Sequence, residues 1–153
     1  MKKTGSFIFF SCLVLFVSAQ NNVSAYVEEL KQTDLAFSKL CVEKGMKVSF
    51  VEYADSNVIK LSNKDFAIRG KAELEKKIAE QKDDFKLEWK PDFAEAAKSG
   101  DLGYTFGNWR LTKADGKLFY GNYMTVWKRQ ADGSWKYVMD AGNATPDNPD
   151  LWK

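Results

Sequence analysis

Residues 99–143 read SGDLGYTFGNWRLTKADGKLFYGNYMTVWKRQADGSWKYVMDAGN, and this stretch decides the fold. Three short segments with glycine next to aspartate, at 99–101, 114–116 and 131–133, separate long runs rich in aromatic and β-branched residues. Such segments are typical of the turns between paired strands. We therefore predict an antiparallel meander with strands at 86–91 and 93–98, on either side of Pro91-Asp92, and then at 102–113, 117–130 and 134–143.

The predicted strands are longer than the usual five or six residues, so the sheet has to twist strongly or bend. Gly103, Gly107 and Gly121 lie inside them. Glycine within a strand often marks a bulge or a close approach of another backbone segment. The second half of the chain is therefore predicted to form a curved sheet.

The first half of the chain has helical periodicity instead. Leu30, Phe37 and Cys41 share one face of a predicted helix at 25–44, which Lys44-Gly45 ends. We also expect a shorter helix from Met46 that ends at 55–57, a small hairpin of 58–61 with 66–68, and a third helix at 71–81. These helices can bury their apolar stripes on the concave side of the sheet. The predicted fold class is α+β, with N-terminal helices packed on a curved antiparallel β-sheet.

Three stretches resemble the DUF4440 group, a SnoaL-like group of the NTF2-like superfamily: SGDLGYTFGNW at 99–109, GNYMTVW at 121–127 and DGSWKYVMD at 132–140. The similarity extends from about residue 25 to residue 143. It implies the cystatin-like cone of this superfamily, with a helix-lined pocket and frequent pairing of two copies through the open face of the sheet. Because the superfamily includes ketosteroid isomerases, cyclases and association domains, the resemblance implies no single reaction.

Asp140 is the first candidate for a catalytic role. It lies in a predicted strand, where carboxylates are uncommon. A carboxylate desolvated inside the cone would have a raised pKa and could act as a general base. Regular alternation places Asp140 with Lys136 and Val138 on one face, and Trp135 and Tyr137 on the other. The sequence leaves open which face meets the helices, and the alternative role for Asp140 is structural.

Asp55, at the predicted end of the second helix, is the second acidic candidate, although capping or turn formation explains it equally well. Five residues are candidates for lining a ligand pocket, because they offer phenolic donors, an amide or an aromatic face. They are Tyr53, Tyr104, Asn108, Trp109 and Tyr123. Their alternative roles are those of ordinary strand and core residues.

The composition of the 153-residue chain excludes several classes of function. The absence of histidine excludes His-based triads, His-dependent zinc sites and His pH switches. With no metal-ligand spacing and no glycine-rich phosphate loop, we predict no metal and no cofactor. Without Lys2 and Lys3, the part beyond residue 19 has 21 basic and 21 acidic side chains. It lacks the basic stripe of a nucleic-acid-binding protein, so we predict no nucleic-acid partner.

Residues 1–19 are typical of a secretory signal peptide. Lys2 and Lys3 precede an uncharged run at 7–19 that ends in Val17-Ser18-Ala19. This run would rise only about 20 Å as a helix, against roughly 30 Å for a bilayer core, so we predict no stable membrane insertion after cleavage. Cleavage after Ala25 is the alternative. The domain at 20–145, followed by an irregular tail at 146–153, is predicted to be secreted or periplasmic.

Three functions remain open at this point. The first is an exported domain that binds a small, mostly apolar molecule in its cone. The second is an isomerase-like or cyclase-like enzyme with a pocket carboxylate as general base. The third is an association module that acts through a homodimer interface on the sheet face. A carboxylate inside the cone favours the enzyme, an open apolar cavity favours the binding domain, and a filled cone favours the association module.

Overall fold

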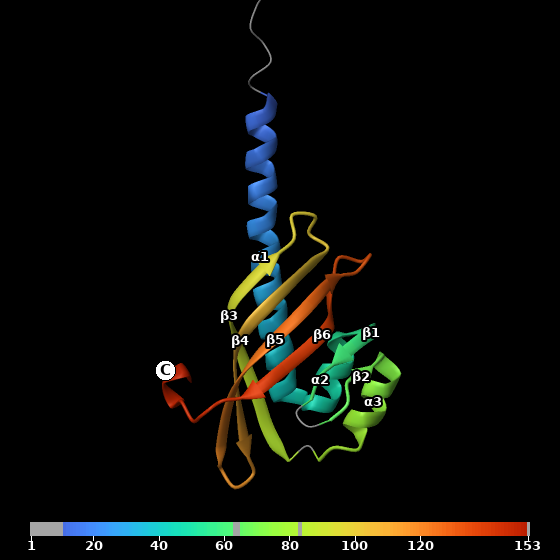
Figure 1. The fold of residues 1–153 in the computed structure, drawn as a ribbon, viewed down its shortest axis with the longest axis vertical. Helices are drawn as coiled ribbons and strands as arrows, with labels where there is room; N and C mark the ends of the chain where they lie inside the picture. The colour runs from blue at the N-terminus through green and yellow to red at the C-terminus, as the bar shows by residue number, and fades with distance from the viewer. Residues whose placement is uncertain (1–10, 63–64, 83, 153) are drawn as a thin grey trace, which may run out of the picture.

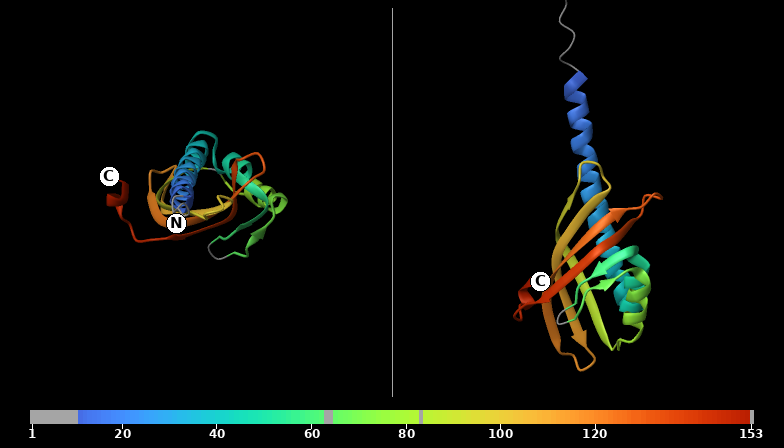
Figure 2. Two further views of the ribbon diagram at one scale, coloured as in Figure 1. Left: turned by 90° about the horizontal axis from the view of Figure 1, so that it is seen from above. Right: turned by 45° about the vertical axis from the view of Figure 1, so that its right-hand side comes forward.

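A computed structural model of the chain describes residues 11–62, 65–82 and 84–152. Its main feature is a six-stranded sheet, in the order β2-β1-β6-β5-β4-β3, that curves around helix α1 (Figures 1 and 2). The four long strands are β3 (Phe85–Ala96), β4 (Leu102–Lys113), β5 (Leu118–Arg129) and β6 (Trp135–Ala144). Each pairs antiparallel with the next in the chain, which confirms the predicted meander.

The first half of the chain supplies three helices and two short strands. They are α1 (Ser11–Lys44), α2 (Met46–Tyr53), β1 (Ala54–Lys60), β2 (Ile68–Arg69) and α3 (Lys71–Ala79). The predicted hairpin is present as β1 and β2. Strand β1 also pairs with β6 in parallel, so the sheet is mixed and not wholly antiparallel. The second helix ends at Tyr53, before the predicted stop, because Ala54 has extended backbone angles and pairs with Tyr137.

Helix α1 lies in the concavity of the sheet and packs mainly against β3 (Figure 2, left). It begins at Ser11, well before the predicted start at 25, and its first part projects beyond the sheet (Figure 1). Residues 22–29 of this helix are exposed or partly exposed, and Leu30 is the first buried residue after them. Residues 1–10 of the predicted signal peptide lie outside the described residues. Within the described ranges, no helix combines the length and apolar character needed to cross a membrane.

The sheet bends where β3 passes close to β4. The register of β3 shifts between Pro91 and Phe93, so the predicted break at Pro91-Asp92 is a bulge within one strand. Gly107 of β4 lies opposite Pro91. A Cβ at Gly107 would clash with the carbonyl oxygen of Lys90. The close backbone approach predicted at this glycine is therefore present.

The core is largely aromatic. Phe37 of α1 lies at its centre, with ring centroids 4.6 Å from Trp89, 5.6 Å from Tyr137 and 6.1 Å from Trp127. Both Trp127 and Tyr137 are fully buried. These large side chains supply much of the apolar area removed from water. They fill the middle of the cone and leave a hollow beside α2 and β1.

The tail after β6 ends in a single 3-10 turn, η1 (Pro149–Trp152). The ring of Trp152 lies 4.5 Å from the guanidinium carbon of Arg110 and 5.4 Å from the Lys90 ammonium. Cation–π contacts of this kind attach the tail to β3 and β4. The tail therefore folds back on the sheet and does not extend the meander.

Candidate functional site

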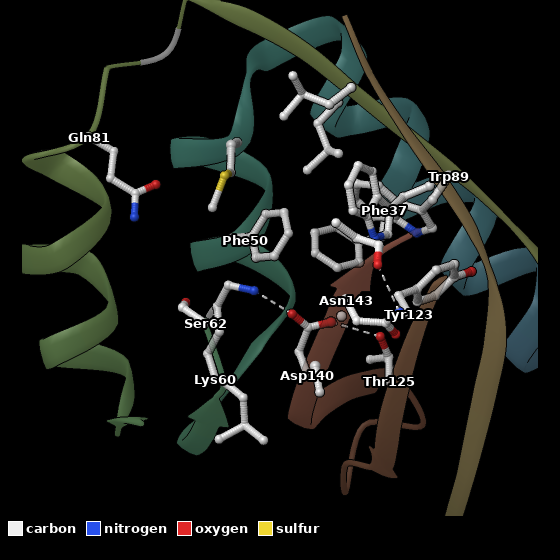
Figure 3. Close-up of a pocket in the computed structure, with 18 residues that line it drawn as sticks. Phe37, Phe50, Lys60, Ser62, Gln81, Trp89, Tyr123, Thr125, Asp140 and Asn143 are labelled. Atoms are coloured by element: carbon white, nitrogen blue, oxygen red, sulfur yellow. Dashed lines mark hydrogen bonds and ion pairs between the residues drawn. The ribbon is translucent and has the colours of Figure 1, made fainter. Parts of the chain in front are cut away.

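A cavity of about 400 Å³ opens between α1, α2, β1 and the concave face of the sheet (Figure 3). Its walls are mostly apolar. Lys60 of β1 and Asp140 of β6 are the two charged side chains among the described residues that line it. Polar side chains of Ser62, Gln81 and Asn143 also line it, and all three residues are solvent-exposed. The cavity therefore combines an apolar wall with one ion pair.

Five aromatic side chains form much of the wall: Phe37, Phe50, Trp89, Trp109 and Tyr123. Three of them carry a polar atom, and each of these atoms is already bonded. The Trp109 Nε1 donates to the carbonyl oxygen of Asn122 at 3.0 Å. The Trp89 Nε1 and the Tyr123 hydroxyl both donate to Asp34, each at 2.7 Å. The wall therefore offers mainly ring carbons to a bound molecule.

Asp34 lies behind this wall on α1, with none of its surface exposed. Burial raises its pKa from 3.8 to about 6, although hydrogen bonds from Tyr123, Trp89 and Thr105 favour the charged form. The negative charge of Asp140 adds a small increase to this pKa. Burial, and then the neighbouring Asp34 carboxylate, raise the pKa of Tyr123, so its hydroxyl stays protonated and acts as a donor.

Asp34 is not among the predicted site residues, although the sequence contains a signal for it. Asp34 follows Leu30 by four residues and precedes Phe37 by three, so it lies on the apolar stripe of the helix. An acidic residue on such a stripe is buried and needs hydrogen-bond partners. Lys60 was missed as well, because nothing in the sequence places its strand beside β6.

Asp140 faces the cavity because β6 contains a bulge. The register of β6 against β5 shifts at Val138, which has no partner there. An extra residue of this kind reverses the alternation of the residues that follow. Asp140 therefore shares the inner face with Tyr137 and is buried. The expectation that Asp140 and Tyr137 lie on opposite faces is wrong.

Both oxygens of the Asp140 carboxylate have partners within the protein. The Lys60 ammonium donates to Oδ2 at 2.5 Å, and the Thr125 hydroxyl donates to Oδ1 at 2.9 Å (Figure 3). Only 12% of the Lys60 side chain and 11% of the Asp140 side chain are exposed. The Lys60 ammonium also lies 4.7 Å from the centroid of the Phe50 ring. The site is thus an ion pair in a mostly apolar hollow. Its two charges cancel, and both carboxylate oxygens have hydrogen-bond partners.

Solved structures share this architecture. An NTF2-like protein of unknown function from Pseudomonas putida KT2440 matches with a TM-score of 0.65 and 15% identity, over 81% of this chain and 89% of that chain. An NTF2-like protein with a cystatin-like fold from Novosphingobium aromaticivorans matches with a TM-score of 0.64 and 11% identity, over 98% of this chain and 97% of that chain. This chain has the NTF2-like, cystatin-like fold. The expected fold class is confirmed.

A third solved structure is that of a proposed ketosteroid isomerase from Parabacteroides distasonis ATCC 8503. It matches with a TM-score of 0.60 and 18% identity, over 72% of this chain and 84% of that chain. Neither the protein-family models nor the curated proteins contain a match to the chain. At these identities the likeness shows the fold alone, so the function has to be argued from the cavity.

The NTF2-like cone brings together only some of the predicted pocket residues. Trp109, Tyr123 and Asp140 line the cavity. Tyr53 stacks on Phe37, with ring centroids 4.8 Å apart, but is not a lining residue. Asp55 lies in β1 and accepts hydrogen bonds from the Asn57 backbone and the Gln130 side chain, away from the cavity.

Tyr104 and Asn108 project from the other face of the sheet. The Tyr104 hydroxyl donates to Glu95 at 2.7 Å, while Asn108 is hydrogen-bonded to Asp92 and Asn122. These three hydrogen bonds connect side chains of neighbouring strands on the convex surface. Neither Tyr104 nor Asn108 lines the cavity.

The cavity offers little for a metal ion. Within the described ranges, no group of three or more Cys, Asp or Glu side chains is arranged to hold one. Among the described lining residues Asp140 is the one carboxylate, and Lys60 already neutralises it. Hard cations prefer six or more oxygen ligands. Among the described residues, the site therefore has the chemistry of an apolar pocket with one hydrogen-bonding end.

Proposed function

We propose that this domain binds a small, mostly apolar molecule in the cavity of its NTF2-like cone. The observation that carries the proposal is the hollow of about 400 Å³ with aromatic walls whose polar atoms are bonded elsewhere. Ligand pockets of small molecules are typically 300–1,000 Å³ or so and largely apolar, with few polar groups. Burial of apolar ligand surface against these rings would supply most of the affinity.

Binding of the dye Nile red tests this proposal. The dye is neutral and becomes fluorescent in apolar surroundings, so we expect saturable binding to the full chain. Leu111→Trp would place a larger side chain in the cavity wall and should weaken binding at least about tenfold. Leu118→Trp is the matched control, because Leu118 is 39% exposed on the convex face. Equal dye binding by both variants would contradict the proposal.

A second candidate function is acid–base catalysis with Asp140 as the general base. It is favoured by one observation, the burial of this carboxylate on the cavity wall. Against it, Lys60 and Thr125 already bond both carboxylate oxygens. A base has to reach the substrate proton directly or through one water. Isomerisation of an unsaturated ketone that disappears in Asp140→Asn, with dye binding retained, would establish catalysis.

We also propose that two copies pair through the convex face of the sheet. Phe93, Phe106 and Met124 lie side by side on neighbouring strands, and each is more than two-fifths exposed. Large contiguous apolar patches often mark interfaces. Sedimentation of the wild type should show a dimer, and Phe106→Glu should yield a monomer that still binds Nile red. A monomeric wild type would exclude this pairing, and with it an association function.

Export of the domain, and its place in the DUF4440 group, rest on the sequence motifs. Cleavage after either Ala19 or Ala25 would keep Tyr26 and Val27, which pack against the core, and Leu30, the first buried residue between 22 and 30. Expression in a bacterium followed by mass spectrometry of the periplasmic fraction tests the proposal. We expect a mature chain that begins at Gln20 or Tyr26. A chain that keeps Lys2 and Lys3 would count against export by cleavage.

A further inference from the structure

We infer that the cavity selects uncharged molecules that carry a hydroxyl group, with the Lys60–Asp140 pair as the recognition element. This inference rests on the proposed binding function and specifies the ligand. Its basis is the charge balance and the hydrogen-bonding capacity of the groups that line the cavity.

The charge balance of the cavity disfavours charged ligands. Lys60 and Asp140 neutralise each other across 2.5 Å, and no other charged side chain is found among the described lining residues. A carboxylate ligand that approached Lys60 would also be repelled by Asp140. An ammonium ligand that approached Asp140 would likewise be repelled by Lys60. Either would add a net charge to a poorly solvated site, which is costly without a partner. An uncharged polar group avoids this cost.

The hydrogen-bonding capacity of the pair suits a group that both donates and accepts. The Lys60 ammonium has three N–H donors, and one is bonded to Asp140. The Asp140 carboxylate has about four acceptor positions, and two are occupied, by Lys60 and Thr125. The Thr125 hydroxyl donates to Asp140, so toward a ligand its oxygen can only accept. A ligand hydroxyl can accept from Lys60 and donate to Asp140 or Thr125.

The rest of the cavity wall explains why the remainder of the ligand should be apolar. The Trp89 Nε1 and the Tyr123 hydroxyl are both bonded to the buried Asp34. The Trp109 Nε1 is bonded to a backbone carbonyl. A second polar group placed against these rings would lose its water without gaining a partner. Ser62, Gln81 and Asn143 also present polar side chains to the cavity, but at solvent-exposed positions, where water can bond a second polar group equally well. The preferred ligand therefore has one hydroxyl directed at the Lys60–Asp140 pair and an apolar, preferably aromatic, body.

Four probes of nearly the same shape test the inference. They are 2-naphthol, 2-methylnaphthalene, 2-naphthoate and 2-naphthylmethylammonium, each used to displace Nile red from the full chain at pH 7.5. We expect 2-naphthol to bind at least about tenfold more tightly than each of the other three, as hydrogen bonds to charged groups predict. In the double variant Lys60→Met with Asp140→Leu, the affinities of 2-naphthol and 2-methylnaphthalene should agree within about twofold.

Each outcome bears on a different claim. If Nile red does not bind at all, the proposed binding function fails and the inference fails with it. If the dye binds but 2-naphthoate, 2-naphthylmethylammonium or 2-methylnaphthalene matches or exceeds 2-naphthol, the selection is wrong while the binding function stands. If the double variant retains the preference for 2-naphthol, the pair is not the recognition element. Should the double variant fail to fold, the ranking of the four probes on the wild type still decides the selection.

Discussion

The buried Asp34 should make the stability of this protein fall as the pH rises from 4 to 7. Its folded-state pKa of about 6 exceeds the ordinary value of 3.8 because burial disfavours the charged form. Between these two values the folded state binds more protons than the unfolded state. The stabilising contribution is therefore complete below pH 3.8 and is lost as the pH rises through 6.

The magnitude follows from the difference between the two pKa values. At about 1.4 kcal/mol for each pKa unit, the difference between 3.8 and about 6 corresponds to about 3 kcal/mol. The linkage relation places about 2.5 kcal/mol of this change between pH 4 and pH 7. The Asp34→Asn variant would have no such dependence, since an amide does not titrate. Rotation of the Tyr123 hydroxyl would let it accept a hydrogen bond from the new amide.

Urea denaturation followed by tryptophan fluorescence, at half-unit intervals from pH 4 to pH 7, measures this effect. We expect the free energy of unfolding of Asp34→Asn, relative to wild type, to rise by about 2.5 kcal/mol across this range. Glu75→Gln is the control for the loss of one carboxylate, because Glu75 is exposed on α3. A flat difference for Asp34→Asn across this range would refute the argument that Asp34 is desolvated.

Three further predictions concern the cavity and the bend of the sheet. Tyr123→Phe should lower the free energy of unfolding by about 1–3 kcal/mol at pH 7.5, since a buried carboxylate loses a donor, and by less at pH 4. Gly107→Ala should be about 1–3 kcal/mol more destabilising in urea than Gly142→Ala, whose added Cβ would have 3.1 Å to its nearest neighbour. Lys60→Met should cost about 3–5 kcal/mol by leaving a carboxylate unpaired, and adding Asp140→Leu should recover most of that loss in a thermodynamic cycle.

The four-stranded meander could be predicted from the sequence because its signals are local. Gly100, Gly116 and Gly133 mark the three hairpins, and all three have positive φ, between 72° and 85°. Each strand between them shows its own apolar and aromatic character. The parallel pairing of β1 with β6 could not be predicted this way, because it joins segments about eighty residues apart. Nothing in either segment alone specifies that partner.

The candidate site depended on the least predictable features of the chain. Residue type alone made Trp109 and Tyr123 pocket candidates, while Asp34 required attention to an acidic residue on an apolar helix stripe. Tyr104 and Asn108 lie on the convex face, which alternation alone could not distinguish from the concave one. Side-chain direction in a strand is known only after one residue has been assigned to a face.

The Lys60–Asp140 ion pair depends on the bulge at Val138. With regular alternation from Tyr137 onward, Met139 would face the cavity in place of Asp140. Lys60 would then lie beside Phe50 with no carboxylate to accept its hydrogen bond, and an unpaired charge in such a place is strongly destabilising. One additional residue in β6 thus supplies the partner that makes a lysine on β1 tolerable. The polar end of the cavity therefore originates in a local irregularity of one strand, and the apolar remainder in the ordinary packing of aromatic side chains.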